Sequence, residues 1–464
     1  MMIQREHRIF FAILNDFTVD FKSVFNILIS MKWNAPRVQA YGQSVNGVQE
    51  NTMQKATQAG IIIVALSALS GMAAAQSVVR LMPLSSGDAF AEDINDNGEV
   101  VGQSMLAGFG MRPTRWDAAG VATNLGLLSG NVTGNAYAIN NNGVIVGVSE
   151  DSNGMGYATL WDGRGGVVDV HSALGATGTS VPWDINDDGV IVGQAKITAG
   201  IFPRGFVWDQ VNPAQQAGTD LYPGGANYGI NNASDLVGSG FFFGDPDDAL
   251  LAVPDGRGGY DYPLINPLGF WFSQARAIND NGMIIGHSGY GSTTATWNAC
   301  IFTGNDRDPV MTLGTLPGLD TSEGADVNDS GMVVGYAWDG TGGGMDPRAW
   351  VWVDGTMYDL NDFLSEGAEF EILSRATGVN NNGDIVGWGR LLDGSVGAFL
   401  IEGFAPPADC LADLNGDGVL DFFDVSTFLS LFNAQDPSVD FDRNDSWDFF
   451  DVSAFLGAYN AGCP

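Results

Sequence analysis

The sequence predicts a mainly β protein: a seven-bladed β-propeller with four-stranded blades over residues 77–404, followed by a small α-helical module over residues 410–464. Two observations lead to this prediction. A ten-residue pattern recurs seven times through the middle of the chain, at a spacing that is typical of propeller blades. After a linker at residues 405–409 the composition changes, and two acidic loops, each followed by a helical apolar pattern, end the chain.

The balance of charge excludes two classes of partner. Asp and Glu total 54 against 19 Lys and Arg, so the 464-residue chain carries a formal net charge of −35. Contacts with nucleic-acid phosphates or anionic lipids need clustered cations, and this chain has few to cluster. Hydrophobic residues nevertheless make up 45% of the chain, which is enough to build a core. We therefore expect a folded acidic protein that binds neither nucleic acid nor an anionic membrane.

The N-terminal region has the features of a processing segment. Lys55 precedes an apolar run at residues 60–69, and three alanines at 73–75 follow it. This order is typical of a secretory signal peptide, and the apolar run is too short for a transmembrane helix. We expect a signal peptide at residues 53–75, with residues 1–52 an over-extended translation start. The protein would then be secreted, without membrane insertion after cleavage.

Each copy of the repeat is expected to open one blade. The first Asn of the copies falls at positions 95, 140, 186, 231, 279, 328 and 380, so the steps run from 45 to 52 residues. In each copy a short strand ends at Ile-Asn or Val-Asn, a turn follows, and a β-branched strand leads out. A third strand that ends on an aromatic residue and a fourth strand complete the blade. Ser234 replaces the turn glycine of the fourth copy, so we expect a looser hairpin there.

The two ends of the repeat region complement each other. The seventh copy has three strands, the third at residues 398–401, and then runs into Pro406 and Pro407 without a fourth. Residues 78–84, which precede the first copy, have the pattern of a fourth strand. If this N-terminal strand completes the last blade, the ring closes without a gap between the first and last blades. We therefore expect residues 78–84 to pair beside Phe399.

The repeat unit Ile-Asn-x-x-Gly-x-Val-Val-Gly, followed by a strand of alanine and aromatic residues, resembles the HAF-type extracellular repeat of bacterial secreted proteins. The resemblance covers most of residues 78–403 and implies a secreted repeat protein without a general catalytic motif. Trp-Asp pairs at 116–117, 161–162 and 208–209 are similar to those of WD40 blades. Because the Gly-His dipeptide of that family is absent, we interpret these pairs as strand-end turns.

The propeller has two candidate sites, the repeated asparagines and the unequal loops. One residue type at the same position of every blade is most simply a device for turns or backbone hydrogen bonds, with a functional ring as the alternative. Function more often lies where blades differ. The loops at 241–248, 268–272 and 340–346 differ most, and their aromatic and acidic residues suit either sugar stacking or packing between blades.

Candidates for catalysis are few. The exported part of the chain has two histidines, His171 and His287, and neither stands in a nucleophile-like context, so we interpret both as ordinary blade-surface residues. Cys300 lies on an expected strand and is interpreted as a buried, inert thiol. Paired carboxylates could hydrolyse glycosides, but no pair in this acidic chain has a distinguishing spacing. The sequence assigns no catalytic residue.

The C-terminal module carries the clearest chemistry. Residues 413–424 have oxygen ligands at loop positions one, three, five, nine and twelve and Gly418 at position six, which is the pattern of a calcium loop. A second copy at 440–451 has Asp445 at position six, where positive φ costs a non-glycine residue about 1 kcal/mol. We expect two calcium ions. The ligands would be Asp413, Asn415, Asp417, the Val419 carbonyl, Asp421 and Asp424 in the first loop, and Asp440, Asp442, Asn444, the Ser446 carbonyl, Asp448 and Asp451 in the second.

Two calcium loops, each followed by one helix and each with Asp at the twelfth position, resemble the type I dockerin over residues 410–464. The resemblance implies that loop positions ten and eleven contact a cohesin-like receptor. Phenylalanines replace the polar pair that is common there, which implies an apolar groove on the partner. The duplication suggests two equivalent docking orientations. The residues concerned are Phe422, Phe423, Phe449 and Phe450.

Two cysteines, Cys410 and Cys463, stand at the edges of this module. In an exported chain they predict a disulfide worth about 4 kcal/mol, and the Gly462-Cys463 ending resembles the GC-type dockerin variant. The sequence thus predicts a secreted, calcium-dependent assembly protein, held on a cohesin-like receptor or cell-surface anchor, with a polysaccharide as a candidate propeller ligand. The alternatives are a polysaccharide-active hydrolase or lyase on a cellulosome-like scaffold and a structural surface-layer component.

Overall fold

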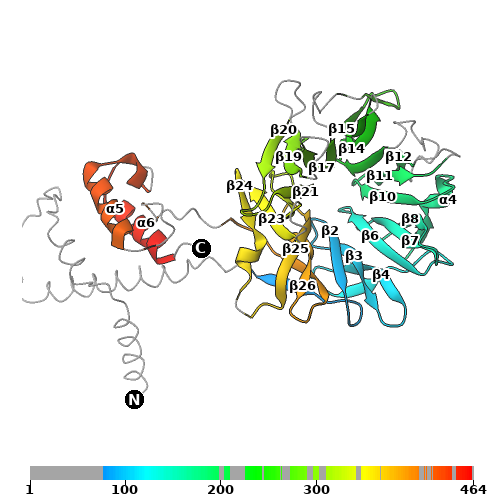
Figure 1. Cartoon of the computed structure of the whole chain (residues 1–464), viewed down its shortest axis with the longest axis horizontal. Helices are drawn as coiled ribbons and strands as arrows, with labels where there is room; N and C mark the ends of the chain where they lie inside the picture. The colour runs from blue at the N-terminus through cyan, green and yellow to red at the C-terminus, as the bar shows by residue number, and fades with distance from the viewer. Residues whose placement is uncertain are drawn as a thin grey trace, which may run out of the picture. The chain divides into compact units, whose positions relative to one another are not determined.

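A computed structural model describes residues 77–464 of the chain apart from a set of gaps. The gaps are residues 198–202, 210–224, 243–244, 262, 264–271, 290–295, 303–309, 341–345, 366, 407–411, 413, 415–419, 421, 442–445 and 462–464. Seven antiparallel sheets form the blades of a propeller, and two longer helices lie near the C-terminus of the chain (Figure 1). No helix of the described part is long and apolar enough to cross a membrane. The predicted start and signal peptide, residues 1–52 and 53–75, lie outside the described residues.

The first three blades follow one another along the chain as antiparallel meanders. Blade 1 consists of β2 (Ala89–Ile94), β3 (Val100–Leu106), β4 (Gly110–Trp116) and β5 (Ala122–Asn124). Blade 2 consists of β6 (Thr133–Ile139), β7 (Ile145–Glu150), β8 (Gly156–Trp161) and β9 (Val167–Asp169), and the short helix α4 (Val170–Ala173) follows. Blade 3 has three described strands, β10 (Ser180–Ile185), β11 (Val190–Ala195) and β12 (Arg204–Asp209).

Blades 4 to 6 continue the same order. Blade 4 consists of β13 (Ala226–Ile230), β14 (Leu236–Phe242), β15 (Asp245–Pro254) and β16 (Tyr260–Asp261). Blade 5 consists of β17 (Phe272–Ile278), β18 (Ile284–Gly289), β19 (Asn298–Phe302) and β20 (Val310–Gly314). Blade 6 consists of β21 (Thr321–Val327), β22 (Val333–Trp338), β23 (Arg348–Val353) and β24 (Thr356–Asp359), followed by the 3-10 helix η3 (Leu360–Phe363).

Blade 7 joins the two ends of the propeller chain. Its strands are β25 (Phe370–Val379), β26 (Ile385–Leu391), β27 (Val396–Ile401) and, as the fourth, β1 (Val78–Leu81). β1 runs antiparallel to β27, with Val78 opposite Ile401 and Arg80 opposite Phe399. The first strand of each blade contacts that of the next, and β25 contacts β2, so these seven strands surround the axis. The predicted closure by the N-terminal strand is confirmed.

The turn after each first strand keeps one geometry in all seven blades. Glycine occupies it in six copies with positive φ, as Gly98 does at 74°. Ser234 takes this place in blade 4 with φ of 65°, and its N–H donates to the Asn231 carbonyl at 3.0 Å, the same distance as from Gly98 to Asn95. The expectation of a looser hairpin is wrong, because Ser234 adopts the left-handed conformation instead of opening the turn.

The hydrophobic core of the propeller lies in clusters between neighbouring blades. In one cluster Ala138 and Val146 of blade 2 pack with Ile185, Ile191 and Phe206 of blade 3. The strands that contribute these side chains, β6, β7, β10, β11 and β12, have no exposed residue, because each blade packs against a neighbour on both faces. Each blade is therefore stabilised by both of its neighbours.

The helical module consists of α5 (Phe422–Ala434) and α6 (Phe449–Ala461), with the 3-10 turn η4 (Pro437–Val439) between them. The rings of Phe428 in α5 and Phe455 in α6 stack with centroids 4.1 Å apart, and both side chains are buried. Ala412 and Val439 complete this small core. A small helical module after the propeller, as the sequence predicts, is therefore present.

Candidate functional site

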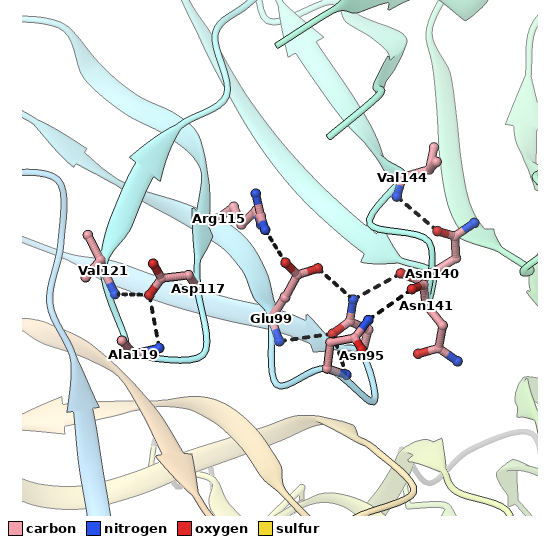
Figure 2. Close-up of polar contacts among 10 residues, drawn as sticks. Asn95, Glu99, Arg115, Asp117, Ala119, Val121, Asn140, Asn141 and Val144 are labelled. Atoms are coloured by element: carbon pink, nitrogen blue, oxygen red, sulfur yellow. Dashed lines mark hydrogen bonds and ion pairs between the residues drawn. The ribbon is translucent and has the colours of Figure 1, made fainter. Parts of the chain in front are cut away.

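Seven asparagine side chains, one from each blade, form a continuous ring of hydrogen bonds around the axis. Nδ2 of Asn95 donates to the Asn140 carbonyl of the next blade at 3.1 Å (Figure 2), and the last contact of the ring runs from Asn380 back to Asn95 at 3.0 Å. Oδ1 of Asn95 accepts the N–H groups of Asn97 and Glu99 in its own turn, both at 3.0 Å. The ring joins all seven blades, which confirms the backbone-bonding interpretation. Its members are Asn95, Asn140, Asn186, Asn231, Asn279, Asn328 and Asn380.

A second ring lies one residue further along each turn. The N–H of each member donates to a side-chain oxygen of its counterpart in the next blade at 2.8–2.9 Å. The two rings line a polar cavity of about 170 Å³ on the axis. Because the side chains of both rings bond to backbone groups of a neighbouring blade, we assign both rings a structural role. The members of the second ring are Asp96, Asn141, Asp187, Asn232, Asp280, Asp329 and Asn381.

Three further carboxylates, those of Asp93, Asp184 and Asp326, link blades next to the first ring. Asp184, for example, accepts the N–H of Ile185 in its own blade at 2.7 Å and the N–H of Ile230 in the next blade at 2.8 Å. Burial raises the pKa of Asp184 to about 7, although the two backbone hydrogen bonds act in the opposite direction. Burial also raises the pKa of Asp93 and Asp326, and at Asp93 the nearby Asp326 charge adds to this effect.

Every first strand carries a β-bulge three residues before its ring asparagine. In β2 the pairing register skips Glu92, and the glycine that ends the repeat, Gly102, pairs with Ala91 just before the bulge. A Cβ on Gly102 would clash with the Phe90 carbonyl oxygen, and the corresponding glycine of every other blade meets the same obstacle. The glycine of each Val-Gly or Ile-Gly pair therefore permits the bulge. The skipped residues are Glu92, Tyr137, Trp183, Tyr228, Arg276, Ala325 and Thr377.

The seven skipped side chains are half-buried and differ from blade to blade. Together with the neighbours that they or their partners contact, they form a band around the axis, which we call the collar. It lies several residues along each strand from the asparagine ring. The contacting neighbours are Phe90, Asn135, Glu323, Tyr336, Arg375 and Trp388.

Aromatic rings occupy one side of the collar, on blades 2, 3 and 4. The Tyr137 and Trp183 rings lie 5.1 Å apart, and the Trp183 and Tyr228 rings lie 6.1 Å apart. The Arg276 guanidinium of blade 5 extends the series, 4.8 Å from the Tyr228 ring centroid. Such distances are typical of favourable aromatic and cation–π contacts. The three rings form a continuous apolar arc that remains partly exposed.

Charged residues occupy the other side, on blades 5, 6, 7 and 1. Arg276 donates to Oε1 of Glu323 at 2.6 Å, which joins blades 5 and 6. The Arg375 guanidinium lies 4.1 Å from the Tyr336 ring centroid, so blade 7 contacts blade 6. In blade 1, Oε1 of Glu92 accepts a hydrogen bond from Nδ2 of Asn135 at 3.0 Å, which returns the circuit to blade 2.

The two carboxyl groups of the collar have pKa values that shift in opposite directions. Burial raises the pKa of Glu92, and the hydrogen bond from Asn135 and the charge of Arg375 only partly offset it. Burial alone would also raise the pKa of Glu323, but the Arg276 charge and the hydrogen bonds from Arg276 and Tyr336 outweigh it, so that this pKa is lowered. Burial and the nearby Glu92 charge raise the pKa of Tyr137 to about 12. Perturbed pairs of this kind are common at functional sites.

The two histidines are buried, not at the blade surface as expected. His171 is 8% exposed, and its Nδ1 lies 2.7 Å from the Ser180 hydroxyl. His287 is 2% exposed beside Glu323, and burial lowers its pKa to about 4, so it is neutral at pH 7. His171 lies in the short helix α4 beside Ser180 of the next blade, and His287 lies in β18 beside Glu323 of the next blade. Cys300 is a buried free thiol whose pKa is raised by burial, which confirms its interpretation.

The Trp-Asp pairs end strands, as predicted. Trp116 is fully buried, while Oδ1 of Asp117 accepts the N–H groups of Ala119 and Val121 at 3.0 and 2.9 Å (Figure 2). Residues 241–248 are not an irregular loop as expected, because apart from 243–244 they belong to the hairpin of β14 and β15. The loops at 268–272 and 340–346 fall largely outside the described residues. The collar is the site that the sequence analysis missed. Its signal was the final glycine of each repeat, which marks a close backbone approach in a strand.

The C-terminal module is described in part. Seven of the twelve predicted calcium ligands lie outside the described residues, as do Cys410 and Cys463: Asp413, Asn415, Asp417, Val419, Asp421, Asp442 and Asn444. Among the described residues, no group of three or more His, Cys, Asp or Glu side chains could hold a metal ion. Of the remaining ligands, Asp424 and Asp451 are fully buried in the first turns of α5 and α6. The others are Asp440, Ser446 and Asp448, which precede α6.

The four phenylalanines lie in two equivalent positions. Phe422 and Phe423 begin α5, and Phe449 and Phe450 begin α6. They are exposed by 73, 64, 63 and 64%, respectively. The core of the module is made by other side chains, above all Phe428 and Phe455. All four phenylalanines are therefore surface residues, and packing within the module explains none of them.

No protein-family model and no curated protein matches the chain. Solved structures with a similar fold include a puromycin hydrolase (14% identity, TM-score 0.46, covering 69% of this chain and 53% of that one). They also include an oligogalacturonate lyase in complex with manganese (14% identity, TM-score 0.44, covering 71% of this chain and 94% of that one). A third is a mutant of the Aleuria aurantia lectin in complex with Fucalpha1-6GlcNAc (10% identity, TM-score 0.28, covering 69% of this chain and 97% of that one). The chain spans about half the length of the puromycin hydrolase. At these identities the similarity concerns the fold alone.

Proposed function

We propose that the protein is a secreted assembly protein whose propeller is displayed on a cell surface or scaffold through its C-terminal module. This module binds two calcium ions and docks on a cohesin-like receptor or a cell-surface anchor. The observation that carries the proposal is the pair of solvent-exposed phenylalanines at the start of each helix, 63–73% exposed. Two large apolar patches on so small a module are unusual for a surface that only faces water.

The donor set of the two loops fits calcium. Only oxygen donors stand at the predicted ligand positions of both loops, as a hard cation requires. Asp451 is fully buried, and its carboxylate accepts the N–H groups of Phe441 and Asp448, both at 2.8 Å. A buried carboxylate is costly without compensation. Calcium, when bound, supplies the positive charge that offsets the loop carboxylates, so Asp424 and Asp451 would tie each loop to its helix. The Cys410–Cys463 disulfide would hold the ends of the module together.

Calcium dependence is tested on the full chain. Isothermal titration with Ca²⁺ should show two bound ions, and Asp451→Ala should remove one of them. EDTA should melt the module while the main propeller transition in calorimetry stays within about 1 °C of its value with Ca²⁺. The propeller transition itself serves as the internal control. A single transition that calcium does not shift would contradict the proposal.

Docking is tested with immobilised type I cohesin domains as the probe. The full chain should be retained in Ca²⁺ and released by EDTA. Changing one pair, Phe422 and Phe423, to alanine should leave retention because the second pair offers an equivalent surface. Changing Phe449 and Phe450 as well should abolish it. Leu392→Ala, an equally exposed apolar residue of the propeller at 70%, is the matched control. Retention of the fourfold variant would refute this docking surface.

A polysaccharide-active hydrolase or lyase is the second candidate. It is favoured by the collar carboxyls, because burial raises the pKa of Glu92 while Arg276 helps lower that of Glu323. Opposed pKa values suit a general acid and a second carboxylate. Release of reducing ends or unsaturated products from a glycan panel, lost in both Glu92→Gln and Glu323→Gln, would support this candidate. Absence of release across the panel favours the binding protein.

A further inference from the structure

At the skipped positions of the collar, the seven blades carry residues that vary from blade to blade. On both sides of each bulge the blades use mostly small residues or Asp, and at the skipped position they use Glu, Tyr, Trp, Tyr, Arg, Ala and Thr. A bulge that served only the fold could carry the same residue in every blade. Variation between blades at half-buried positions around an axis is typical of a ligand site on a repeated scaffold.

We propose that the collar binds a neutral sugar ring of a glycan. The inference rests on the proposed function in one respect, that the propeller is the ligand-binding part that the C-terminal module displays. Tyr137, Trp183 and Tyr228 present a continuous aromatic arc across three blades, with centroids 5.1 and 6.1 Å apart. The C–H face of a pyranose is apolar and packs on such rings, while its hydroxyl groups point sideways toward polar side chains.

Polar atoms of the collar without a hydrogen-bond partner among the described residues match the hydroxyl groups of a sugar. Asn135 is only 7% exposed, donates to Glu92 through Nδ2, and has no donor for its Oδ1. Nε1 of Trp183 and Nε of Arg375 are buried donors without an acceptor. Buried polar atoms of this kind normally have partners. A hydroxyl group both donates and accepts, so vicinal hydroxyls can satisfy such a mixed set.

Charge decides between a neutral and an acidic glycan. Two arginines of the collar, Arg276 and Arg375, stand with two glutamates, Glu92 and Glu323, and Arg276 is already paired with Glu323 at 2.6 Å. The collar therefore offers no surplus of positive charge. The chain as a whole has a net charge of −35, which repels polyanions. These observations favour a neutral ligand, one without uronate or sulfate groups.

The test uses the full chain and a panel of soluble neutral oligosaccharides: cellohexaose, xylohexaose, mannohexaose and laminarihexaose, with polygalacturonate as the acidic arm. Binding is measured by isothermal titration and by quenching of tryptophan fluorescence. At least one neutral probe should bind. Trp183→Ala should weaken that binding about tenfold or more, and Trp183→Phe, which keeps a ring but loses Nε1, about threefold. Phe109→Ala, an aromatic 64% exposed on the β3–β4 hairpin, should leave it unchanged.

Three outcomes would overturn the proposal: no neutral probe binds, polygalacturonate binds in their place, or Trp183→Ala binds as the unchanged protein does. Thermal melting of each variant identifies misfolding, and Trp183→Phe gives the answer if Trp183→Ala does not fold. The fourfold phenylalanine variant of the C-terminal module separates this proposal from docking. It should bind the neutral probe normally, so loss of docking and loss of sugar binding are distinct results.

Discussion

Replacing Asn140 by alanine removes three hydrogen bonds from the axis of the propeller at once. Nδ2 of Asn140 donates to the Asn186 carbonyl at 2.9 Å, and its Oδ1 accepts the N–H groups of Asn142 and Val144 at 3.1 and 2.9 Å. Asn140 is 5% exposed, so water cannot readily replace these bonds. At about 1 kcal/mol for each net hydrogen bond, we expect the free energy of unfolding to fall by about 3 kcal/mol.

Thermal unfolding followed by circular dichroism measures this loss. With about 2.1 cal/mol/K of unfolding entropy per residue, a propeller of roughly 330 residues has about 0.7 kcal/mol/K, so Tm should fall by about 4 °C. Asn141→Ala is the matched control, since the next residue lies in the exposed second ring and should cost under about 1 kcal/mol. If Asn140→Ala melts no lower than Asn141→Ala, the reasoning that buried amides fasten the blades is refuted.

Three further changes test other parts of the fold. Ser234→Gly should raise stability by about 1 kcal/mol because glycine adopts the positive φ of 65° without strain; Ser234→Ala, which keeps the strain, should not stabilise in the same melting assay. Deleting residues 77–81 removes β1 and exposes the edge of β27, so size-exclusion chromatography should show association that the full chain lacks; a monomeric deletion variant with unchanged Tm would contradict closure. The pKa of Asp184 is about 7 in the folded state against an ordinary 3.8, so its stabilising contribution is present below about pH 4 and lost as pH rises to 7. The excess Tm of the unchanged protein over Asp184→Asn should therefore shrink across that range, and a constant difference would argue against the shift.

The blades could be predicted because the seven copies of the repeat can be aligned with one another within the one sequence. Seven Asn positions fix the period, and a strand missing at one end with a strand spare at the other fixes the closure at β1 and β27. The turn at Ser234 could not be predicted in detail, since the sequence shows a missing glycine but not whether the turn opens or serine takes its conformation. The surrounding hydrogen bonds to Asn231 decide this.

The collar could not be predicted from alternation, because a bulge shifts the register by a single residue. A period-two pattern assigns Glu92 and the six equivalent residues to one face of a regular strand, and it gives no sign that residues of adjacent blades contact them. The burial of the histidines could not be predicted for a related reason. His287 is buried beside Glu323 of β21 and Trp297, which precedes β19, and the alternation within β18 predicts neither contact. The exposed phenylalanines could be predicted from the duplicated loops, since helix starts and loop positions are local features.

The second ring has a consequence that follows from arithmetic alone. Around the axis its residues read Asp, Asn, Asp, Asn, Asp, Asp, Asn. Nδ2 of Asn232 donates to the carboxylates on both sides, those of Asp187 and Asp280, at 3.4 and 2.8 Å. A circle with an odd number of members cannot alternate perfectly, so two like residues must meet once. They meet as Asp280 and Asp329, where two negative charges face each other at the boundary of blades 5 and 6. The odd number of blades thus places two carboxylates next to each other at one position of the ring. A ring of six or eight blades could alternate Asp and Asn throughout and avoid this contact.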